Sequence, residues 1–326
     1  MGYGKQLFPR FPKEPEEAER MIDEELGLPL VRDREIEKTM QREEREQQVL
    51  DLVGRQPENK LNIGCLDVGQ GDATVIRLPT GEVIVVDCNT ADANVDLVDF
   101  LKSCGVDVID YLVITHPHYD HFSGVQKLVD NFQIRNLMEP SIERTDITEE
   151  ARAEYDLYCD TVNELEKHGT TILHPVASSD VYKEIGDVKL SVYGPSRAGI
   201  ERAEGLEQEV HTNSIVMKIG YGDFKMLFSG DVDRDGWARI AKYYDIESTV
   251  LHASHHGSVS GCDEQSIEKI SPSRTIISAG RGNPFGHPDG EAVKIYKEYS
   301  TNGTRTTKNG SLGISASKDG SYVFYD

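Results

Sequence analysis

The stretch IDYLVITHPHYDH, residues 109–121, joins an apolar run to three histidines and an aspartate. Six of its first seven residues, all but Asp110, are hydrophobic or β-branched, which predicts a strand. The polar residues that follow lie on a loop held by that strand, where functional sites are usually built. In an extended loop, His116 and His118 point the same way because they are two residues apart. Asp120 and His121 begin the turn into the next helix, so we expect them to face a second ion.

The His-x-His-x-Asp-His spacing is typical of a metal site rather than of histidines in a core. Imidazole and carboxylate ligands suit Zn²⁺ and also admit Mn²⁺ or Fe²⁺. We therefore expect two divalent metal ions, with Zn or Mn favoured. Two ions about 3.5–4 Å apart can share one water and lower its pKa to about 7. The cluster predicts a metal-dependent hydrolase.

Outward from this stretch, short strands alternate with helices. The runs 61–69, 73–78 and 82–88 are β-rich and predict an antiparallel meander. Later strands are expected at 188–194, 214–220, 224–230, 248–254 and 274–280, with a closing hairpin at 312–325. Helices are expected near 94–104, 123–131, 147–168, 234–244, 263–270 and 290–299. This order predicts an α/β (α+β) fold with two sheets and helices on their outer faces.

The N-terminal segment, residues 1–58, is rich in Glu, Arg and Gln. We predict two helices in it, at about 15–26 and 32–54. It forms a charged helical extension to a domain that we place at 59–326. We expect the extension to pack on the domain or on a second subunit, which would make a homo-oligomer.

Charge and composition narrow the function classes. The 326 residues include 35 basic and 57 acidic ones, a formal net charge of −22. Binding along a nucleic-acid duplex recruits Lys and Arg, so strong duplex DNA binding is not expected. No apolar run is long enough for a membrane span, and the five cysteines form no CxxC pair. These features predict a cytoplasmic protein that does not bind a membrane.

The HPHYDH cluster resembles that of the metallo-β-lactamase-fold hydrolases. More specifically, the chain is similar to the ComEC-like, competence-protein branch, in a soluble stand-alone form. The motifs that carry this resemblance are LDVGQGDATVIRLPTGEVIVVDCN (66–89), SIVMKIGYGDFKMLFSGDVD (214–233), VLHASHHGS (250–258) and GNPFGHP (282–288). With HPHYDH they span most of residues 61–326. The resemblance implies a four-layer αβ/βα sandwich with two metal ions.

The resemblance also implies further ligands. Asp231, in the sequence Phe228-Ser229-Gly230-Asp231, would bridge the two metals, although it could instead cap the helix at 234–244. His211 would complete the first site with His116 and His118, or it is a surface histidine. One of His255 and His256 would complete the second site with Asp120, His121 and Asp231, and we favour His256.

Other residues of these motifs are expected around the metals. His287 follows a strand and is a candidate for holding a substrate oxyanion or protonating a leaving group, or else its loop caps the next helix. His255 and Ser258 are candidates for metal or substrate contact. Asp87 is expected to orient a ligand histidine without binding the metal itself. Asp72 lies in a turn that the resemblance places beside the metals, and we assign it no catalytic role.

Three functions remain open. The first is a dinuclear phosphodiesterase or nuclease, with Asp120 and His287 as catalytic residues and a small or single-stranded phosphodiester as substrate. The second keeps the metals but acts on a small phosphoester of the phosphocholine type, a lactone or a thioester. The third is a non-catalytic regulatory or binding module, against which the complete ligand set argues.

Overall fold

The computed structural model describes residues 31–55, 59–91, 93–145, 148–203 and 207–326. The chain divides into two units, Met1–Glu44 and Arg45–Asp326. The helix α2, Val31–Gly54, begins in the first unit and ends in the second, which matches the helix predicted at 32–54. The helix predicted at 15–26 lies outside the described residues. None of the helices in the described ranges combines the length and apolar character that a membrane crossing requires.

The second unit is built on two mixed β-sheets. One has eight strands in the order β15-β14-β1-β2-β3-β4-β5-β6, and the other has seven in the order β13-β12-β11-β10-β9-β8-β7. The strands of the eight-stranded sheet are β1 Leu61–Cys65, β2 Thr74–Arg77, β3 Val83–Val86, β4 Val108–Val113, β5 Gln133–Met138, β6 Thr171–Leu173, β14 Leu312–Ala316 and β15 Tyr322–Tyr325. Those of the seven-stranded sheet are β7 Lys183–Ile185, β8 Val188–Gly194, β9 Val216–Tyr221, β10 Phe224–Phe228, β11 Val250–His252, β12 Arg274–Ile277 and β13 Thr304–Thr306.

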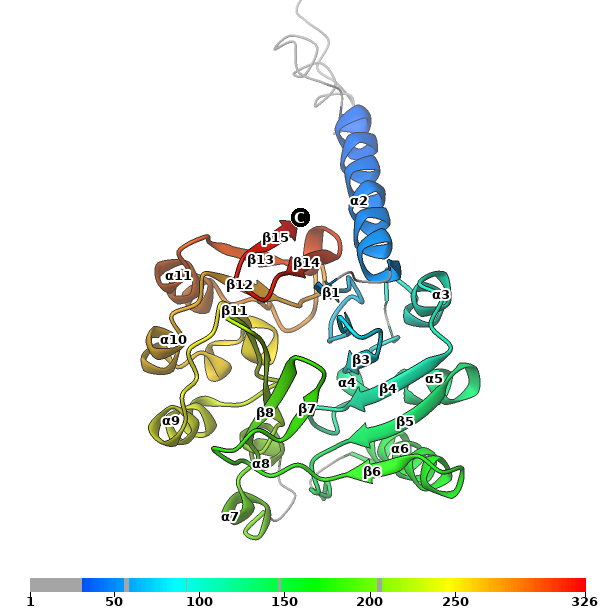
Figure 1. Cartoon of the computed structure of the whole chain (residues 1–326), viewed down its shortest axis with the longest axis vertical. Helices are drawn as coiled ribbons and strands as arrows, with labels where there is room; N and C mark the ends of the chain where they lie inside the picture. The colour runs from blue at the N-terminus through cyan, green and yellow to red at the C-terminus, as the bar shows by residue number, and fades with distance from the viewer. Residues whose placement is uncertain (1–30, 56–58, 92, 146–147, 204–206) are drawn as a thin grey trace, which may run out of the picture. The chain divides into compact units, whose positions relative to one another are not determined.

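Helices cover the outer face of each sheet. Beyond the end of α2, the α-helices in the described residues of this unit are α3 Leu97–Ser103, α4 Tyr119–Phe122, α5 Val125–Asn131, α6 Glu149–Lys167, α7 Arg197–Ile200, α8 Glu207–Thr212, α9 Arg234–Tyr243, α10 Glu264–Ile270 and α11 Gly290–Tyr299. One hydrophobic cluster joins the eight-stranded sheet to α3, α5 and α6, a second lies between the sheets, and a third joins the seven-stranded sheet to α9, α10 and α11. Figure 1 shows these two groups of helices on opposite sides of the sheets. The predicted α/β sandwich is confirmed.

The end of α2 packs on this domain. Val49 and Val53 are fully buried, and both approach the backbone of Gly64 in β1. The last carbonyl groups of α2 have no partners within the helix, and side chains of the domain supply them. The Arg77 guanidinium donates to Val53 O at 2.6 Å, and Asn62 Nδ2 donates to Leu52 O at 3.0 Å. The residues from Arg45 onward are therefore tied to the core.

The parallel strands of both sheets determine where the loops at their carboxyl ends lie. β3, β4, β5 and β6 run parallel to one another, as do β10, β11, β12 and β13. Ligands bind outside the carboxyl ends of such strands. The loops after β4 and before β9 are joined there, because Ile215 N donates to Thr115 O at 2.8 Å. The loops of the two sheets thus meet at one edge.

Candidate metal centre

Two groups of potential metal ligands lie at this edge. His116, His118 and the residues up to His121 follow β4, and His211 lies at the end of α8. Asp231 follows β10, His255 and His256 follow β11, and Asp72 comes from the loop between β1 and β2. The fold therefore gathers side chains that are scattered along the sequence.

The first group consists of His116, His118, His211 and Asp231, whose ligand atoms all lie within 4.8 Å of one another. The ring centroid of His118 is 4.5 Å from that of His116 and 4.6 Å from that of His211. Three imidazoles and one carboxylate whose ligand atoms lie this close together suit one metal ion with tetrahedral coordination.

The second group consists of Asp72, His121, Asp231 and His256, which are all buried and meet the same 4.8 Å limit. Asp231 belongs to both groups. Its Oδ2 lies 3.6 Å from His116 Nε2, and its Oδ1 lies 3.5 Å from His121 Nε2. It does not cap the next helix, because the Asp233 side chain accepts from Gly236 N at 2.8 Å and caps α9. The carboxylate of Asp231 is thus placed between the two groups.

Asp72 enters the second group through a close backbone approach. Gly71 has φ +130°, and a Cβ on it would lie 2.4 Å from Asp120 O. Asp72 N donates to that same carbonyl at 3.2 Å. Only glycine allows this contact, which brings Asp72 beneath the histidine loop. Sequence reasoning left Asp72 without a role, and the glycine directly before it was the available signal.

Asp87 orients His121. Its Oδ2 accepts from His121 Nδ1 at 2.8 Å, and its Oδ1 accepts from Thr115 N at 2.7 Å. Thr115 Oγ1 also donates to Asp87 Oδ2 at 2.8 Å. A proton on Nδ1 leaves Nε2 of His121 as the ligand atom, and it points to the second group.

Asp120 lies at the rim of the second group. Its Oδ2 is 3.1 Å from His256 Nε2, its Oδ1 is 3.9 Å from His121 Nε2, and its side chain is 33% exposed. It is not among the four residues with mutually close ligand atoms. Burial disfavours its charge, but His121 and His256 lower the pKa of Asp120 below its ordinary value. Asp120 is therefore an ionised carboxylate that faces both the histidines and solvent.

The donor atoms fit divalent cations. His116 Nε2, His121 Nε2 and Asp231 Oδ1 are buried and have no hydrogen-bond partner within the described part of the chain. Buried polar atoms normally have such partners, so convergent atoms without them are typical of metal ligands. Burial lowers the pKa of His116 well below its ordinary value, which keeps it in the neutral form that ligates. Burial opposes charge on His121 too, but Asp231, Asp87 and Asp120 together raise its pKa.

The remaining predicted residues lie around these groups. His255 lies beside the first group, with its ring 4.5 Å from that of His211 and its Nε2 3.8 Å from Asp231 Oδ2. The His287 ring is 5.7 Å from that of His255, outside both groups. Burial is the main cause that lowers the pKa of His287. The Ser258 hydroxyl contacts Ser260 Oγ at 2.9 Å, so the structure does not bring it to either group.

Three backbone conformations around the site are unusual. Asp87, His255 and His256 have φ of 56°, 51° and 53°, in the left-handed region that favours glycine. Such conformations persist only where the surrounding structure enforces them, and they cluster at functional sites. Here they turn three polar side chains toward the ligand groups.

A family model and curated proteins match most of this chain. The model of the metallo-beta-lactamase superfamily matches residues 66–281. ComE operon protein 3 of Bacillus subtilis is 23% identical over 268 residues, covering 77% of this chain and 32% of that protein. Competence protein ComA of Neisseria gonorrhoeae is 23% identical over 280 residues, covering 82% of this chain and 35% of that protein. The chain spans about a third of the length of these relatives.

Among solved structures, a mutant of the CmlA beta-hydroxylase is similar with a TM-score of 0.44 and 13% identity. The match covers 77% of this chain and 52% of that one. A likeness at this level carries no argument about function.

Proposed function

The chain belongs to the metallo-beta-lactamase superfamily, and we propose that it is a dinuclear metal-dependent hydrolase of phosphodiesters. The observation that carries the proposal is the pair of ligand groups that share Asp231. Two adjacent divalent ions activate a water and neutralise charge on phosphoryl oxygens, which is the chemistry that phosphodiester hydrolysis needs.

The residues around the groups supply the remaining functions. Asp120 is ionised and partly exposed, so it can accept a hydrogen bond from a water that enters at the rim and orient that water. Asp120 Oδ2 lies 3.1 Å from His256 Nε2, so this carboxylate is next to a ligand atom of the second group. His287 has a lowered pKa and is neutral near pH 7, so it suits hydrogen-bond donation to a substrate oxygen better than full proton transfer.

A nucleic acid or nucleotide is the favoured substrate. The curated relatives include a competence protein, and the motifs resemble the hydrolase domain of ComEC-type DNA-uptake proteins. The net charge of −22 disfavours a long duplex groove, whereas two divalent ions would add positive charge where a phosphate docks. We therefore propose short or single-stranded substrates, held mainly at the metals.

The test combines metal analysis with a substrate panel. Protein reconstituted with Zn²⁺ or Mn²⁺ is assayed on bis-p-nitrophenyl phosphate, single-stranded DNA and RNA, and its metal content is measured. We expect about two ions per chain and phosphodiester turnover that His118→Ala and Asp120→Ala both abolish. His168→Ala, an exposed histidine at the end of α6, is the matched control and should retain activity. Turnover that survives both site substitutions would reject the proposal.

A further inference from the structure

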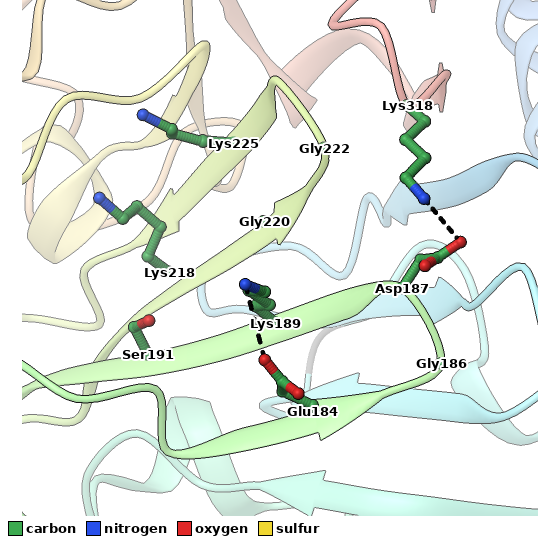
Figure 2. Close-up of a pocket in the computed structure, with 10 residues that line it drawn as sticks. All are labelled: Glu184, Gly186, Asp187, Lys189, Ser191, Lys218, Gly220, Gly222, Lys225 and Lys318. Carbon is green, nitrogen blue, oxygen red and sulfur yellow. Dashed lines mark ion pairs between the residues drawn. The ribbon is translucent and has the colours of Figure 1, made fainter.

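A hollow of about 590 Å³ lies on the outer face of the seven-stranded sheet, and its lining includes four lysines (Figure 2). These are Lys189, Lys218, Lys225 and Lys318. The hollow lies at the turn between β9 and β10, around Gly222. His211 and Asp231 adjoin the other ends of these two strands. The hollow is thus separate from the metal centre.

Three of the lysines stand on one face of neighbouring strands. Gly220 of β9 pairs with Lys189 of β8 on one side and with Lys225 of β10 on the other. Lys218 lies two residues before Gly220 and therefore points to the same face. Neighbouring strands lie about 4.8 Å apart, so Lys189 and Lys225 flank Gly220 at about 10 Å from each other.

Gly220 leaves the floor of the hollow open. A Cβ on this residue would meet nothing closer than Lys189 O at 3.9 Å. Glycine weakens the interior of a strand, and neither space nor a positive φ requires it here. A residue that disfavours its secondary structure and is not required there by packing is often found at a functional site. The missing side chain keeps room between Lys189 and Lys225.

The fourth lysine comes from the other sheet. Lys318 lies in the turn between β14 and β15, and its carbonyl accepts from Asp223 N at 2.9 Å. Gly222, with φ +59°, permits this approach, because a Cβ on it would lie 1.9 Å from Lys318 O. Figure 2 shows the Lys318 side chain reaching from this turn toward Asp187. Both sheets therefore build the hollow.

The lining is positive although the chain is acidic. Lys189 pairs with Glu184 at 3.5 Å and Lys318 with Asp187 at 2.9 Å, and the side chains of both pairs are exposed. Exposed pairs of this kind are weak, so a ligand with more charge can replace the carboxylates. Lys225 has no ion pair with any residue that the structure describes. The lining holds four lysines and two carboxylates, and Lys218 Nζ also lies 4.0 Å from Asp245 Oδ2, so the hollow is locally positive on a chain whose net charge is −22.

Lys218 and Lys225 also repel each other. Lys218 is nearly buried, and its Nζ donates to Asp245 O at 2.6 Å. Burial is the main cause that lowers the pKa of Lys218; the charge of Asp245 opposes this shift, and the charge of Lys225 adds a smaller lowering. An anion bound between the two ammonium groups would relieve this repulsion.

We propose that this hollow binds a small oligophosphate, an anion of nucleotide size that carries two or more phosphoryl groups. Its volume lies in the range of small-ligand sites and exceeds what a single phosphate fills. Lysines bind phosphoryl groups as point charges, and Ser191, opposite Lys218 on β8, adds a hydroxyl donor. The lysines line one hollow, and the net charge of −22 disfavours binding of a long polyanion, which favours a compact ligand.

The experiment measures binding of inorganic tripolyphosphate to the full chain by isothermal titration calorimetry. Lys225→Ala should weaken binding at least tenfold. Gly220→Val fills the floor and should abolish binding while the melting temperature stays equal or rises, because valine suits a strand. Lys127→Ala, an exposed lysine of α5, is the matched control and should bind as the unsubstituted chain does.

Several results would overturn the proposal. The first is that the unsubstituted chain does not bind tripolyphosphate. The second is that Lys225→Ala and Gly220→Val bind it as tightly as the unsubstituted chain does. The third is that a single-stranded oligonucleotide binds more tightly than tripolyphosphate. Tripolyphosphate is also a chelator, so the titration is repeated on His118→Ala, in which binding at the hollow should persist. Hydrolysis of bis-p-nitrophenyl phosphate by Lys225→Ala should be unchanged. Failure of the phosphodiesterase proposal therefore leaves this test intact.

Discussion

Replacing Asp87 by asparagine should change the tautomer of His121 without changing the shape of the site. Asp87 Oδ1 accepts from Thr115 N at 2.7 Å, so the amide oxygen of the asparagine must take this position. The amide NH₂ then faces His121 Nδ1, at the place where Oδ2 lies 2.8 Å away. Nδ1 can accept this hydrogen bond only if the imidazole proton moves to Nε2. Nε2 is the atom that points to the second ligand group, and a protonated nitrogen cannot ligate.

The expected effect is confined to one ion. The second group would lose one of its four ligand atoms, whereas the first group contains neither Asp87 nor His121. Loss of such an orienting carboxylate typically weakens metal affinity about 10- to 100-fold, which corresponds to about 1.4–2.7 kcal/mol. Titration of metal-free protein with Zn²⁺ against a competing chelator should show two tight sites in the unsubstituted chain and one in Asp87→Asn.

Asp110→Asn is the matched control. Asp110 is also a buried carboxylate, and its Oδ2 accepts from Val83 N at 2.9 Å, but it belongs to neither ligand group. This variant should keep both tight sites, and thermal melts in chelator show whether each variant is folded. Two sites of unchanged affinity in folded Asp87→Asn would refute the tautomer argument.

Three further substitutions test the packing and the buried charges. Gly64→Ala places a Cβ within 3.1 Å of two valine methyl groups of α2, so we expect a loss of about 1–3 kcal/mol in urea unfolding and faster hydrogen exchange at the end of that helix. In Gly71→Ala the new Cβ would lie 2.4 Å from Asp120 O, at a residue whose φ is +130°. We expect the free energy of unfolding to fall by about 1–3 kcal/mol and Zn²⁺ titrations to show loss of the second site. Burial raises the pKa of Glu139, which accepts from the Tyr158 hydroxyl, so ionising it costs stability as the pH rises through that raised value. Glu139→Gln should therefore shift the urea midpoint upward at pH 8 and leave it nearly unchanged at pH 4; an equal shift at both values would contradict this.

The fold was predictable where local patterns are strong. The strand at 188–194 and the helix at 290–299 are found at the expected residues, because alternation and apolar spacing mark them clearly. The strands β5 and β6 were missed. β5 has the sequence QIRNLM, whose polar residues hide the pattern, and β6 has only three residues. Both depend on parallel pairing with neighbours far along the chain, which a local pattern does not show.

The candidate site was predictable to a similar degree. HPHYDH is a local signal, and His116, His118 and His121 do lie among the grouped ligand atoms. Asp120 and Asp72 show where local reasoning ends. Asp72 lies in a loop and Asp120 in the short helix α4, and the close contact between Gly71 and the backbone of Asp120 brings the Asp72 carboxylate to the buried group. That contact joins loops from different strands, so it is a property of the folded chain.

The division of the candidate ligands between two sheets also bears on how the chain would acquire metal ions. Asp72 and the residues from His116 to His121 belong to loops of the eight-stranded sheet, and His211, Asp231 and His256 belong to loops of the seven-stranded one. A nascent chain that has not yet released His256 from the ribosome cannot form the second group. If both groups bind metal as proposed, tight binding requires that the two sheets have docked, and the bound ions would then stabilise the contact between the sheets.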